Sequence, residues 1–375
     1  MIYADNAATA QLRPAACAAM AAWLGPDGFG NASSIYKLAR DAKKALEEAR
    51  KTVASALGAK PNEIYFTSGG TESNCIAILG AAKRAGVSAV TSKAEHPSVL
   101  NSFKELSNRG VDVKYLQPDK SGLISLEGLN DRTVLVSLSH VNHETGVITD
   151  IEGISRAIKS YNKDILLHID AVQGFGKHPI DVRKWNADLI SVSAHKMHGM
   201  SGTGALYVRA GVLGKLKPII YGGGHERGLR PGTENLAGIS AFGAAAEVCT
   251  KDMEKNIIHV TKIKNRLSEI PQEIEGAVIN GEGNLSPYII NISFMGVNSE
   301  VLQSALDARK IYVSAGAACN TGNKTPDNVV FSYGLGAARA ESAIRISLSK
   351  YNTPDDAEIL ITALKELVPS LRRIV

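Results

Sequence analysis

The fold is decided by the stretch Asp188-Leu-Ile-Ser-Val-Ser-Ala-His-Lys196-Met-His-Gly-Met-Ser-Gly-Thr-Gly204. Its first half is a short apolar run between polar residues, which predicts a buried strand, and its second half is rich in glycine. Ser193, His195 and Lys196 follow the strand, where an open α/β sheet presents side chains to a crevice. A lysine in such partly apolar surroundings loses its proton readily, as Schiff-base chemistry requires. Lys196 is therefore a candidate Schiff-base residue, although this motif alone also fits a solvated lysine at a strand end.

The surrounding chain, residues 63–208, alternates between strand and helix patterns. Such alternation is typical of a mostly parallel sheet with helices on both faces. Because the carboxyl ends of parallel strands share one edge, the polar residues after each strand are expected to lie together. These residues are Thr71, His96, Asn142, His143, Asp170, Gln173, Ser193, His195 and Lys196.

The strand predicted for Ile64–Ser68 leads directly into Gly69-Gly-Thr-Glu-Ser-Asn74 and a helix. A strand, a glycine turn and a helix N-terminus form an anion cradle, because free backbone N–H groups and the helix dipole point to one place. Gly70 and Thr71 are the candidates for this role. By itself the same run also fits a capped turn, and it matches neither a Walker loop nor a dinucleotide fingerprint.

The combination of residues indicates one cofactor. An anion cradle suits a phosphate, the His96 imidazole can stack on a flat ring, the Asp170 carboxylate suits a protonated pyridine nitrogen, and Lys196 suits an aldehyde. These four groups together match pyridoxal 5'-phosphate (PLP).

Composition limits the class of protein. The 375 residues are 44% hydrophobic, 21% charged and 5% aromatic, with a formal net charge of +5, which fits a globular protein of about two domains and favours no nucleic-acid partner. No signal peptide or membrane-spanning run is visible. The four cysteines are scattered, which favours a reducing cytoplasm over disulfides or a zinc site, so no metal is expected.

Longer motifs carry a resemblance across nearly the whole chain. The sequence resembles the cysteine desulfurases of the class V aminotransferase family of PLP-dependent enzymes. The motifs that carry it are Tyr3-Ala-Asp-Asn-Ala-Ala-Thr9, Phe66-Thr-Ser-Gly-Gly-Thr-Glu-Ser-Asn74, Glu95-His96, His168-Ile-Asp-Ala-Val-Gln173, Ser193-Ala-His-Lys196, Gly222-Gly-Gly-His-Glu-Arg-Gly-Leu-Arg-Pro-Gly-Thr-Glu-Asn235 and Ser314-Ala-Gly-Ala-Ala-Cys319.

The resemblance implies a role for each matching residue. Lys196 would bond to the cofactor, His96 would stack on its ring and assist proton transfer, and Cys319 would be the nucleophile that takes sulfur from L-cysteine as a persulfide. Arg345 and Asn31 would bind the substrate. The implied cofactor-binding residues are Gly70, Thr71, His96, Asn142, His143, Asp170, Gln173, Ser193, His195, Lys196 and, from the second subunit of a homodimer, Thr233.

The resemblance also implies an aspartate-aminotransferase-like α/β fold. It has a large, mostly parallel sheet domain, expected for residues 13–255, and a smaller α+β domain, expected for residues 1–12 and 256–375, which carries the catalytic cysteine loop. A sulfur-acceptor protein, such as an iron–sulfur scaffold or a tRNA-thiolation enzyme, would receive the persulfide.

Several positions depart from the family pattern: His143 stands where a second asparagine is usual, Ala315 and Ala317 stand where serines are common, and Cys75 replaces a usual asparagine. A histidine at position 143 is bulkier and can titrate, so ring electronics or a substrate preference different from those of the family are expected. Three alternatives share most of the motifs: a selenocysteine or cystine lyase, a class V aminotransferase that does not need Cys319, and a docking scaffold for a sulfur acceptor with residual catalysis.

Overall fold

The computed structural model describes residues 1–26, 28–316 and 329–372. Cys319 therefore lies outside the described residues. The large sheet has the strand order β2-β8-β7-β6-β5-β3-β4, in which β8 runs antiparallel to its neighbours β7 and β2. The pairings of β3, β4, β5, β6 and β7 are parallel. The strands are β2 (Ile64–Thr67), β3 (Ser88–Ser92), β4 (Asp112–Leu116), β5 (Thr133–Ser139), β6 (Leu166–Asp170), β7 (Leu189–Ser193) and β8 (Gly204–Val208).

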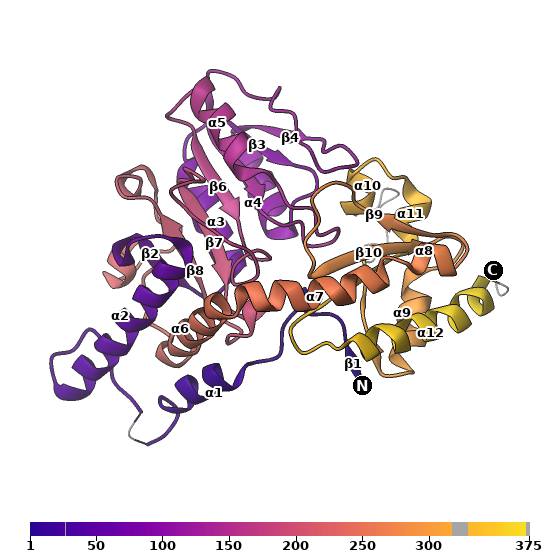
Figure 1. The fold of residues 1–375 in the computed structure, drawn as a ribbon. Coiled ribbons are helices and arrows are strands. Elements are labelled where there is room, and N and C mark those ends of the chain that lie inside the picture. Colours follow the sequence, from indigo (N-terminus) through magenta and orange to yellow (C-terminus); the bar gives the residue numbers. More distant parts are fainter. Residues whose placement is uncertain (27, 317–328, 373–375) are drawn as a thin grey trace.

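Helices cover both faces of this sheet (Figure 1). Successive strand side chains point to opposite faces, so Leu189 joins the core beneath one set of helices while Ile190 joins the core beneath the other. The first set contains α3 (Gly70–Ala81) and α4 (Pro97–Asn108). The second set contains α2 (Lys37–Leu57), α5 (Ile151–Tyr161) and α6 (Leu236–Lys251), with α1 (Pro14–Ala21) packed on α6.

A second, antiparallel sheet lies beside the large one and has the order β12-β13-β10-β9 (Figure 1). Its core also contains Ile2, Ala4 and Ala7, because β1 (Ile2–Tyr3) pairs with β11 (Ile311–Tyr312). Both ends of the chain therefore meet in this part of the molecule. Its other elements are α7 (Met253–Leu267), α8 (Ile270–Glu273), β9 (Ala277–Asn280), β10 (Ile289–Phe294), α9 (Ser299–Asp307), β12 (Ser314–Ala315), α10 (Val329–Ser332), α11 (Ala337–Glu341), β13 (Ala343–Ser347) and α12 (Pro354–Arg372).

The α/β fold with a large, mostly parallel sheet is confirmed, with two local differences from the sequence pattern. The helical pattern from Leu236 to Leu267 predicts one helix, but α6 ends at Lys251 and α7 begins at Met253, because Asp252 leaves helical geometry (φ −93°, ψ 2°). The small side chain of Cys17 suits a core, yet this residue is exposed on α1. No helix in the described part of the chain is long and apolar enough to cross a membrane.

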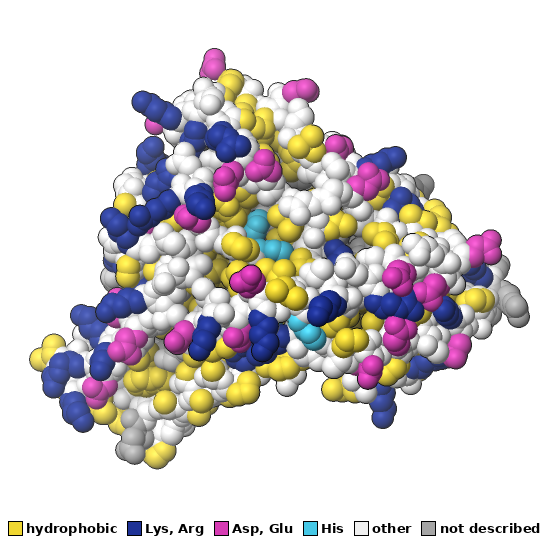
Figure 2. Space-filling view, in the orientation of Figure 1, with side chains coloured by type: hydrophobic (Ala, Val, Ile, Leu, Met, Phe, Trp, Pro, Cys, Tyr) yellow, Lys and Arg dark blue, Asp and Glu magenta, His cyan; other side chains and the backbone are white. Residues whose placement is uncertain are grey.

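Charged side chains of both signs are interspersed over the face shown in Figure 2. This distribution agrees with the small net charge of +5. No single-sign field of the kind that steers a polyanion stands out on this face.

One buried ion pair fixes the glycine-rich loop that precedes Thr233. The Arg50 guanidinium of α2 donates to both carboxylate oxygens of Glu226 at 2.7 Å, and Glu226 also accepts the backbone N–H of Phe66 at 2.8 Å. Both side chains of the pair are almost fully buried. Glu226 itself has a left-handed backbone (φ 45°), a strained conformation that these contacts hold in place.

Replacing Glu226 with glutamine leaves the Arg50 charge buried without a carboxylate. We expect the free energy of unfolding to fall by about 3–5 kcal/mol, measured by urea denaturation. Glu48→Gln is the control, because Glu48 forms only an exposed ion pair with Lys44 and its loss should cost under about 1 kcal/mol. Equal effects of the two substitutions would show that the buried pair does not stabilise the loop.

Candidate active site

A cleft of about 1100 Å³ lies at the carboxyl ends of the parallel strands. It is bounded by polar residues of the large sheet on one side and by residues of the antiparallel sheet on the other. Most of the predicted site residues line it, although they come from six separate segments of the chain. They are Gly70, Thr71, His96, His143, Asp170, Gln173, Ser193, His195, Lys196 and Arg345.

Lys196 lies in the 3₁₀ turn that follows β7. Its Nζ donates hydrogen bonds to the carbonyl oxygens of Ala7, at 2.6 Å, and of Ala8. Burial, followed by the Arg345 charge, lowers the pKa of Lys196 to about 8 against the opposing effect of Asp5 and Asp170. A substantial fraction of this lysine is therefore a neutral amine near pH 8, so it can act as a nucleophile or a base.

Asp170 is the last residue of β6 and is buried beneath the cleft. Its Oδ1 accepts the backbone N–H of Val172 at 3.0 Å, and its Oδ2 accepts the Asn74 amide at 2.7 Å. Asn74 in turn donates to Ser98 Oγ at 2.9 Å. These contacts fix the carboxylate and leave it facing the cleft, where a cationic ring nitrogen would complete its surroundings.

The N-terminus of α3 faces the same cleft. Gly69 has φ 154°, and a Cβ added to Gly70 would lie 2.6 Å from Val172 Cγ2, so both positions require glycine. Beside them, Ser193 Oγ is buried, with the residue only 1% exposed, and has no hydrogen-bond partner within the described chain. A helix N-terminus and an unpartnered hydroxyl group suit the oxygens of a phosphate.

Gln173 and His195 flank this cradle. Gln173 Nε2 donates to Ala7 O at 2.9 Å, and its Oε1 accepts from Lys177 Nζ at 3.3 Å. The His195 Nδ1 atom lies 3.2 Å from Thr9 Oγ1. Burial, followed by the Lys196 charge, lowers the pKa of His195 to about 4, so its neutral ring keeps one N–H available to donate.

His96 and His143 face each other edge to face, with ring centroids 5.2 Å apart. His96 is open to the cleft and caps α4, since its Nδ1 accepts the backbone N–H of Ser98 at 3.1 Å. Burial, followed by the neighbouring His96, lowers the pKa of His143 well below 6.5. His143 is therefore uncharged at neutral pH, which corrects the expectation that it can titrate there.

Arg345 lies on β13 of the antiparallel sheet, with its side chain directed to the cleft wall. Its Nη2 donates to Asp5 Oδ1 at 2.9 Å, and its Nη1 donates to Glu144 Oε1 at 3.2 Å and to His143 O at 3.0 Å. Its Nε has no partner within the described chain. The two carboxylates hold the guanidinium plane in a fixed orientation, with Nε left without an acceptor among the described residues.

Of the predicted residues that the structure describes, three are not among those that line the cleft. Asn142 is buried, its Oδ1 accepts the N–H groups of Glu144 and Thr145, and its amide donates to Ala94 O, so it braces the turn that carries His143. Asn31 and Thr233 are exposed away from the cleft. Cys319 lies outside the described residues, and the site roles of all four stay predictions.

The structure adds two carboxyl groups that the sequence patterns do not single out as site residues. Glu95 and Glu144 line the cleft and are buried, and burial raises the pKa of Glu95 to about 8. Each has one carboxyl oxygen without a hydrogen-bond partner in the described chain. Each of these glutamates is adjacent in sequence to a predicted site residue: Glu95 directly precedes His96, and Glu144 directly follows His143. This adjacency could have predicted that both line the cleft.

The cleft residues fit PLP. The unpartnered Ser193 hydroxyl at the α3 N-terminus suits the phosphate, Asp170 suits the ring nitrogen, and the Lys196 amine suits the aldehyde. Among the described residues, no three His, Cys, Asp or Glu side chains gather as a metal ion would require.

Comparison with known proteins agrees with this geometry. The family model "Aminotransferase class-V" matches residues 2–360. A curated cysteine desulfurase IscS from Vibrio vulnificus (strain YJ016) is 41% identical over 381 residues, covering 99% of this chain and 93% of that protein. A solved NifS-like protein superposes with a TM-score of 0.91 at 34% identity, covering 99% of this chain and all of that one. SspA in complex with cysteine superposes with a TM-score of 0.81 at 35% identity, covering 94% and 100% of the two chains. The chain belongs to the class V aminotransferase family.

Proposed function

We propose that this protein is a PLP-dependent cysteine desulfurase, which converts L-cysteine to L-alanine and leaves a persulfide on Cys319. The observation that carries the proposal is the convergence of the Lys196 amine, the Asp170 carboxylate, the α3 N-terminus and the Arg345 guanidinium on one cleft. The relatives named cysteine desulfurase and the SspA complex with cysteine support the choice of reaction and substrate.

The described chain on both sides of Cys319 supports its role. Ser314 and Ala315 of β12 line the cleft on one side of the cysteine in sequence, and Val329, Phe331 and Ser332 line it on the other. The segment that contains Cys319 therefore begins and ends at the cleft that holds Lys196.

Different residues of the cleft would bind the cofactor and transfer protons in this proposal. When bound, PLP supplies a carbonyl carbon that bonds to amines and a ring that withdraws electrons from the α-carbon of the substrate. The Lys196 amine is placed to take the α-proton of the substrate, since its pKa is lowered to about 8. Asp170 would hold a proton on the ring nitrogen, and His96 would stack on the ring and assist proton transfer.

Cys319 completes the reaction as a thiolate nucleophile. Its sulfur attacks the substrate sulfur, so an S–S bond forms and the substrate C–S bond breaks. The electron pair of the broken bond stays on the substrate carbon, which takes up a proton and leaves as alanine. The persulfide on Cys319 then passes to an acceptor protein.

Arg345 binds the substrate α-carboxylate in this proposal. In Arg345→Gln we expect kcat/KM for L-cysteine to fall roughly 10- to 100-fold, mostly through KM, because a charged hydrogen bond is lost. Arg345→Lys keeps the charge without the planar fork, so its kcat/KM should lie between those of the two enzymes. An unchanged KM in Arg345→Gln, with PLP still bound, would assign Arg345 only to its ion pairs with Asp5 and Glu144.

His143 stays neutral in the working range, because its pKa lies well below 6.5 in the folded protein. We therefore expect His143→Asn to leave the pH dependence of the visible PLP spectrum unchanged between about pH 6 and pH 9. A spectrophotometric titration of both proteins measures this. A displaced midpoint in the variant would mean that His143 titrates and tunes the cofactor.

The decisive test of the reaction is product analysis. Purified enzyme with PLP and a thiol reductant should convert L-cysteine to alanine and sulfide in equal amounts. Preference for selenocysteine or cystine would make it a lyase for those amino acids, and amino transfer that depends on a keto acid would make it an aminotransferase. An acceptor protein bound tightly without any turnover would make it a scaffold.

The proposal extends to assembly and location. We expect a homodimer, in which Thr233 reaches the partner's phosphate site, since Thr233 is exposed and does not line the cleft of its own chain. Exposed Leu24, Phe29 and Ile35 offer apolar surface for the contact. Sedimentation measures the mass of the assembly and so tests for the dimer.

The proposed acceptor is an iron–sulfur scaffold or a tRNA-thiolation enzyme in the cytoplasm.

We also propose the domain division at residues 13–255, with residues 1–12 and 256–375 forming the smaller domain. The shared hydrophobic cluster of Ile2, Ala4 and Ala7 with the antiparallel sheet supports this division.

A further inference from the structure

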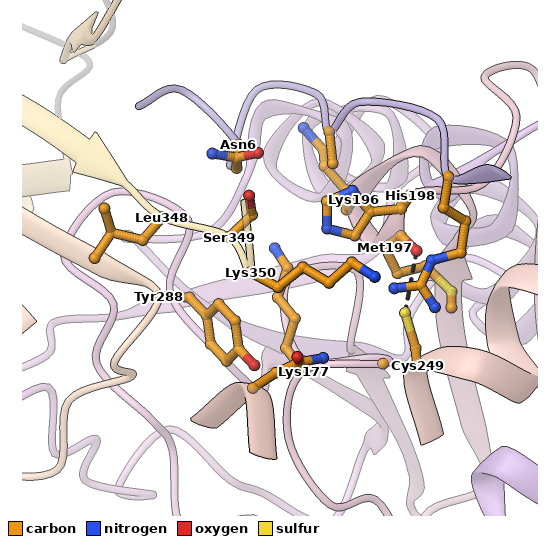
Figure 3. A pocket seen from close by; sticks show the side chains of 14 residues that line it. Asn6, Lys177, Lys196, Met197, His198, Cys249, Tyr288, Leu348, Ser349 and Lys350 are labelled. Atoms are coloured by element: carbon orange, nitrogen blue, oxygen red, sulfur yellow. Dashed lines mark hydrogen bonds between the residues drawn. The ribbon is translucent and has the colours of Figure 1, made fainter. Parts of the chain in front are cut away.

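A second, much smaller pocket of about 20 Å³ is lined in part by Lys196 (Figure 3). Four cationic side chains contribute to its lining, and no aspartate or glutamate does. The cations come from the segment before α1, the turn after β6, the turn after β7 and the segment after β13. They are Arg13, Lys177, Lys196 and Lys350.

Arg13 is the most deeply buried of these cations, with only 1% of the residue exposed. One nitrogen, Nη1, donates to Ala245 O at 3.5 Å, whereas Nε and Nη2 have no partner within the described chain. A buried guanidinium with free donors costs several kcal/mol unless an acceptor is present. Within the described residues no carboxylate reaches it, so an acceptor from outside this part of the chain would satisfy the free donors.

Lys177 faces the same pocket and is 6% exposed. Its Nζ donates to Gln173 Oε1 at 3.3 Å. Burial, followed by the Lys196 charge, lowers the pKa of Lys177 to about 7. An anion beside it would favour the charged form.

The electrostatic field in this region is positive. Arg13, Lys177 and Lys350 all lower the pKa of His198, which burial brings to about 4, and the same three cations oppose the raised pKa of the Cys249 thiol. Figure 3 shows His198, Lys350 and Cys249 around the pocket, with the Cys249 thiol donating to Met197 O at 3.2 Å. The Asp252 carboxylate is the smallest of the named influences on Cys249.

We propose that this pocket binds one chloride-sized inorganic anion between Arg13, Lys177 and Lys350. A cavity needs roughly 10–15 Å³ to hold one water molecule, so a pocket of about 20 Å³ suits a ligand of about that size, such as a monatomic anion. The anion accepts the free Arg13 donors and offsets the clustered positive charge.

The bound anion acts on the cleft through a chain of hydrogen bonds. Lys177 donates to Gln173 Oε1, Gln173 donates to Ala7 O at 2.9 Å, and Lys196 donates to the same carbonyl at 2.6 Å. An anion that keeps Lys177 charged therefore maintains the contact that orients Gln173, so chloride is a positioning ligand of the active site.

Bromide identifies the site directly, because it replaces chloride and scatters anomalously. In crystals of the PLP-bound enzyme soaked in sodium bromide, we expect an anomalous peak within hydrogen-bonding distance of Arg13, and we expect Lys350→Gln to weaken it and Arg13→Gln to abolish it. A pocket that holds only water at high bromide concentration overturns the proposal.

Thermal unfolding in solution gives a second readout, which does not depend on turnover. At constant ionic strength, replacing gluconate with chloride should raise the midpoint of the enzyme by roughly 2 °C or more, and Lys350→Gln should lose most of this rise. Lys83→Gln is the matched control, since exposed Lys83 contacts only the distant Lys215 carbonyl. An equal chloride effect in both variants would assign the rise to general salt action and overturn the site.

Discussion

Lys196→Ala is expected to lower the turnover of L-cysteine by about 10⁴-fold or more, because it removes both the covalent attachment of PLP and the base for the α-proton. The structure gives this lysine the required properties. Its amine lies in the cleft, and burial and Arg345 lower its pKa to about 8. Alanine and sulfide release from cysteine measures the loss.

A chemical readout separates attachment from catalysis. Borohydride reduction of the PLP-bound wild type should fix the cofactor to the peptide that contains Lys196, as seen by mass spectrometry, and should label no lysine in Lys196→Ala. Lys264→Ala is the matched control, since burial also lowers the pKa of Lys264 to about 8, yet this lysine donates to Ser286 O outside the cleft. Labelling of another lysine in the wild type would reject the assignment.

The parts of the site that follow strands could be predicted from the sequence. Asp170 ends β6 and Ser193 ends β7, and parallel pairing places these ends at one edge of the sheet. His96 and Lys196 occupy the same edge because each follows its strand within a few residues. For these residues, the strand pattern and the rule that parallel strands end at one edge of the sheet are sufficient to predict the site.

The contacts that couple distant segments could not be predicted in the same way. Arg345 is held by Asp5, which lies 340 residues earlier in the chain, and by Glu144 from the turn after β5. No periodicity links these positions, because the N-terminal arm reaches β13 through long-range pairing, of β1 with β11 and of Asp5 with Ser347. The cationic pocket around Arg13 could not be predicted either, because its lining residues come from segments far apart in the sequence.

The antiparallel direction of β8 also could not be predicted from the alternation of strands and helices in the sequence. The run Gly204–Val208 is apolar and fully buried, as a parallel strand would be, so composition alone does not give its direction. The glycine-rich turn between β7 and β8 is short enough for a hairpin, whereas a parallel crossover needs a dozen residues or more. The number of residues between the two strands was the available signal, and the alternation of strands and helices concealed it.

Cys319→Ala is expected to keep bound PLP and its visible spectrum while lowering alanine formation from L-cysteine by about 10²-fold or more. The substitution removes the thiolate that accepts sulfur and leaves the cleft residues that hold the cofactor unchanged. Spectroscopy and product analysis of one sample therefore separate cofactor binding from sulfur transfer.

Cys17→Ala controls for the loss of a thiol, because Cys17 is exposed on α1 and does not line the cleft, and it should turn over like the wild type. A persulfide-trapping alkylating agent, followed by mass spectrometry, should find the extra sulfur on Cys319 of the wild type and of Cys17→Ala. If Cys319→Ala instead releases alanine at the wild-type rate, sulfur leaves the substrate without a protein nucleophile. The enzyme would then be a lyase, in which Lys196 and Arg345 keep their roles and the segment that carries Cys319 does not take part in the chemistry.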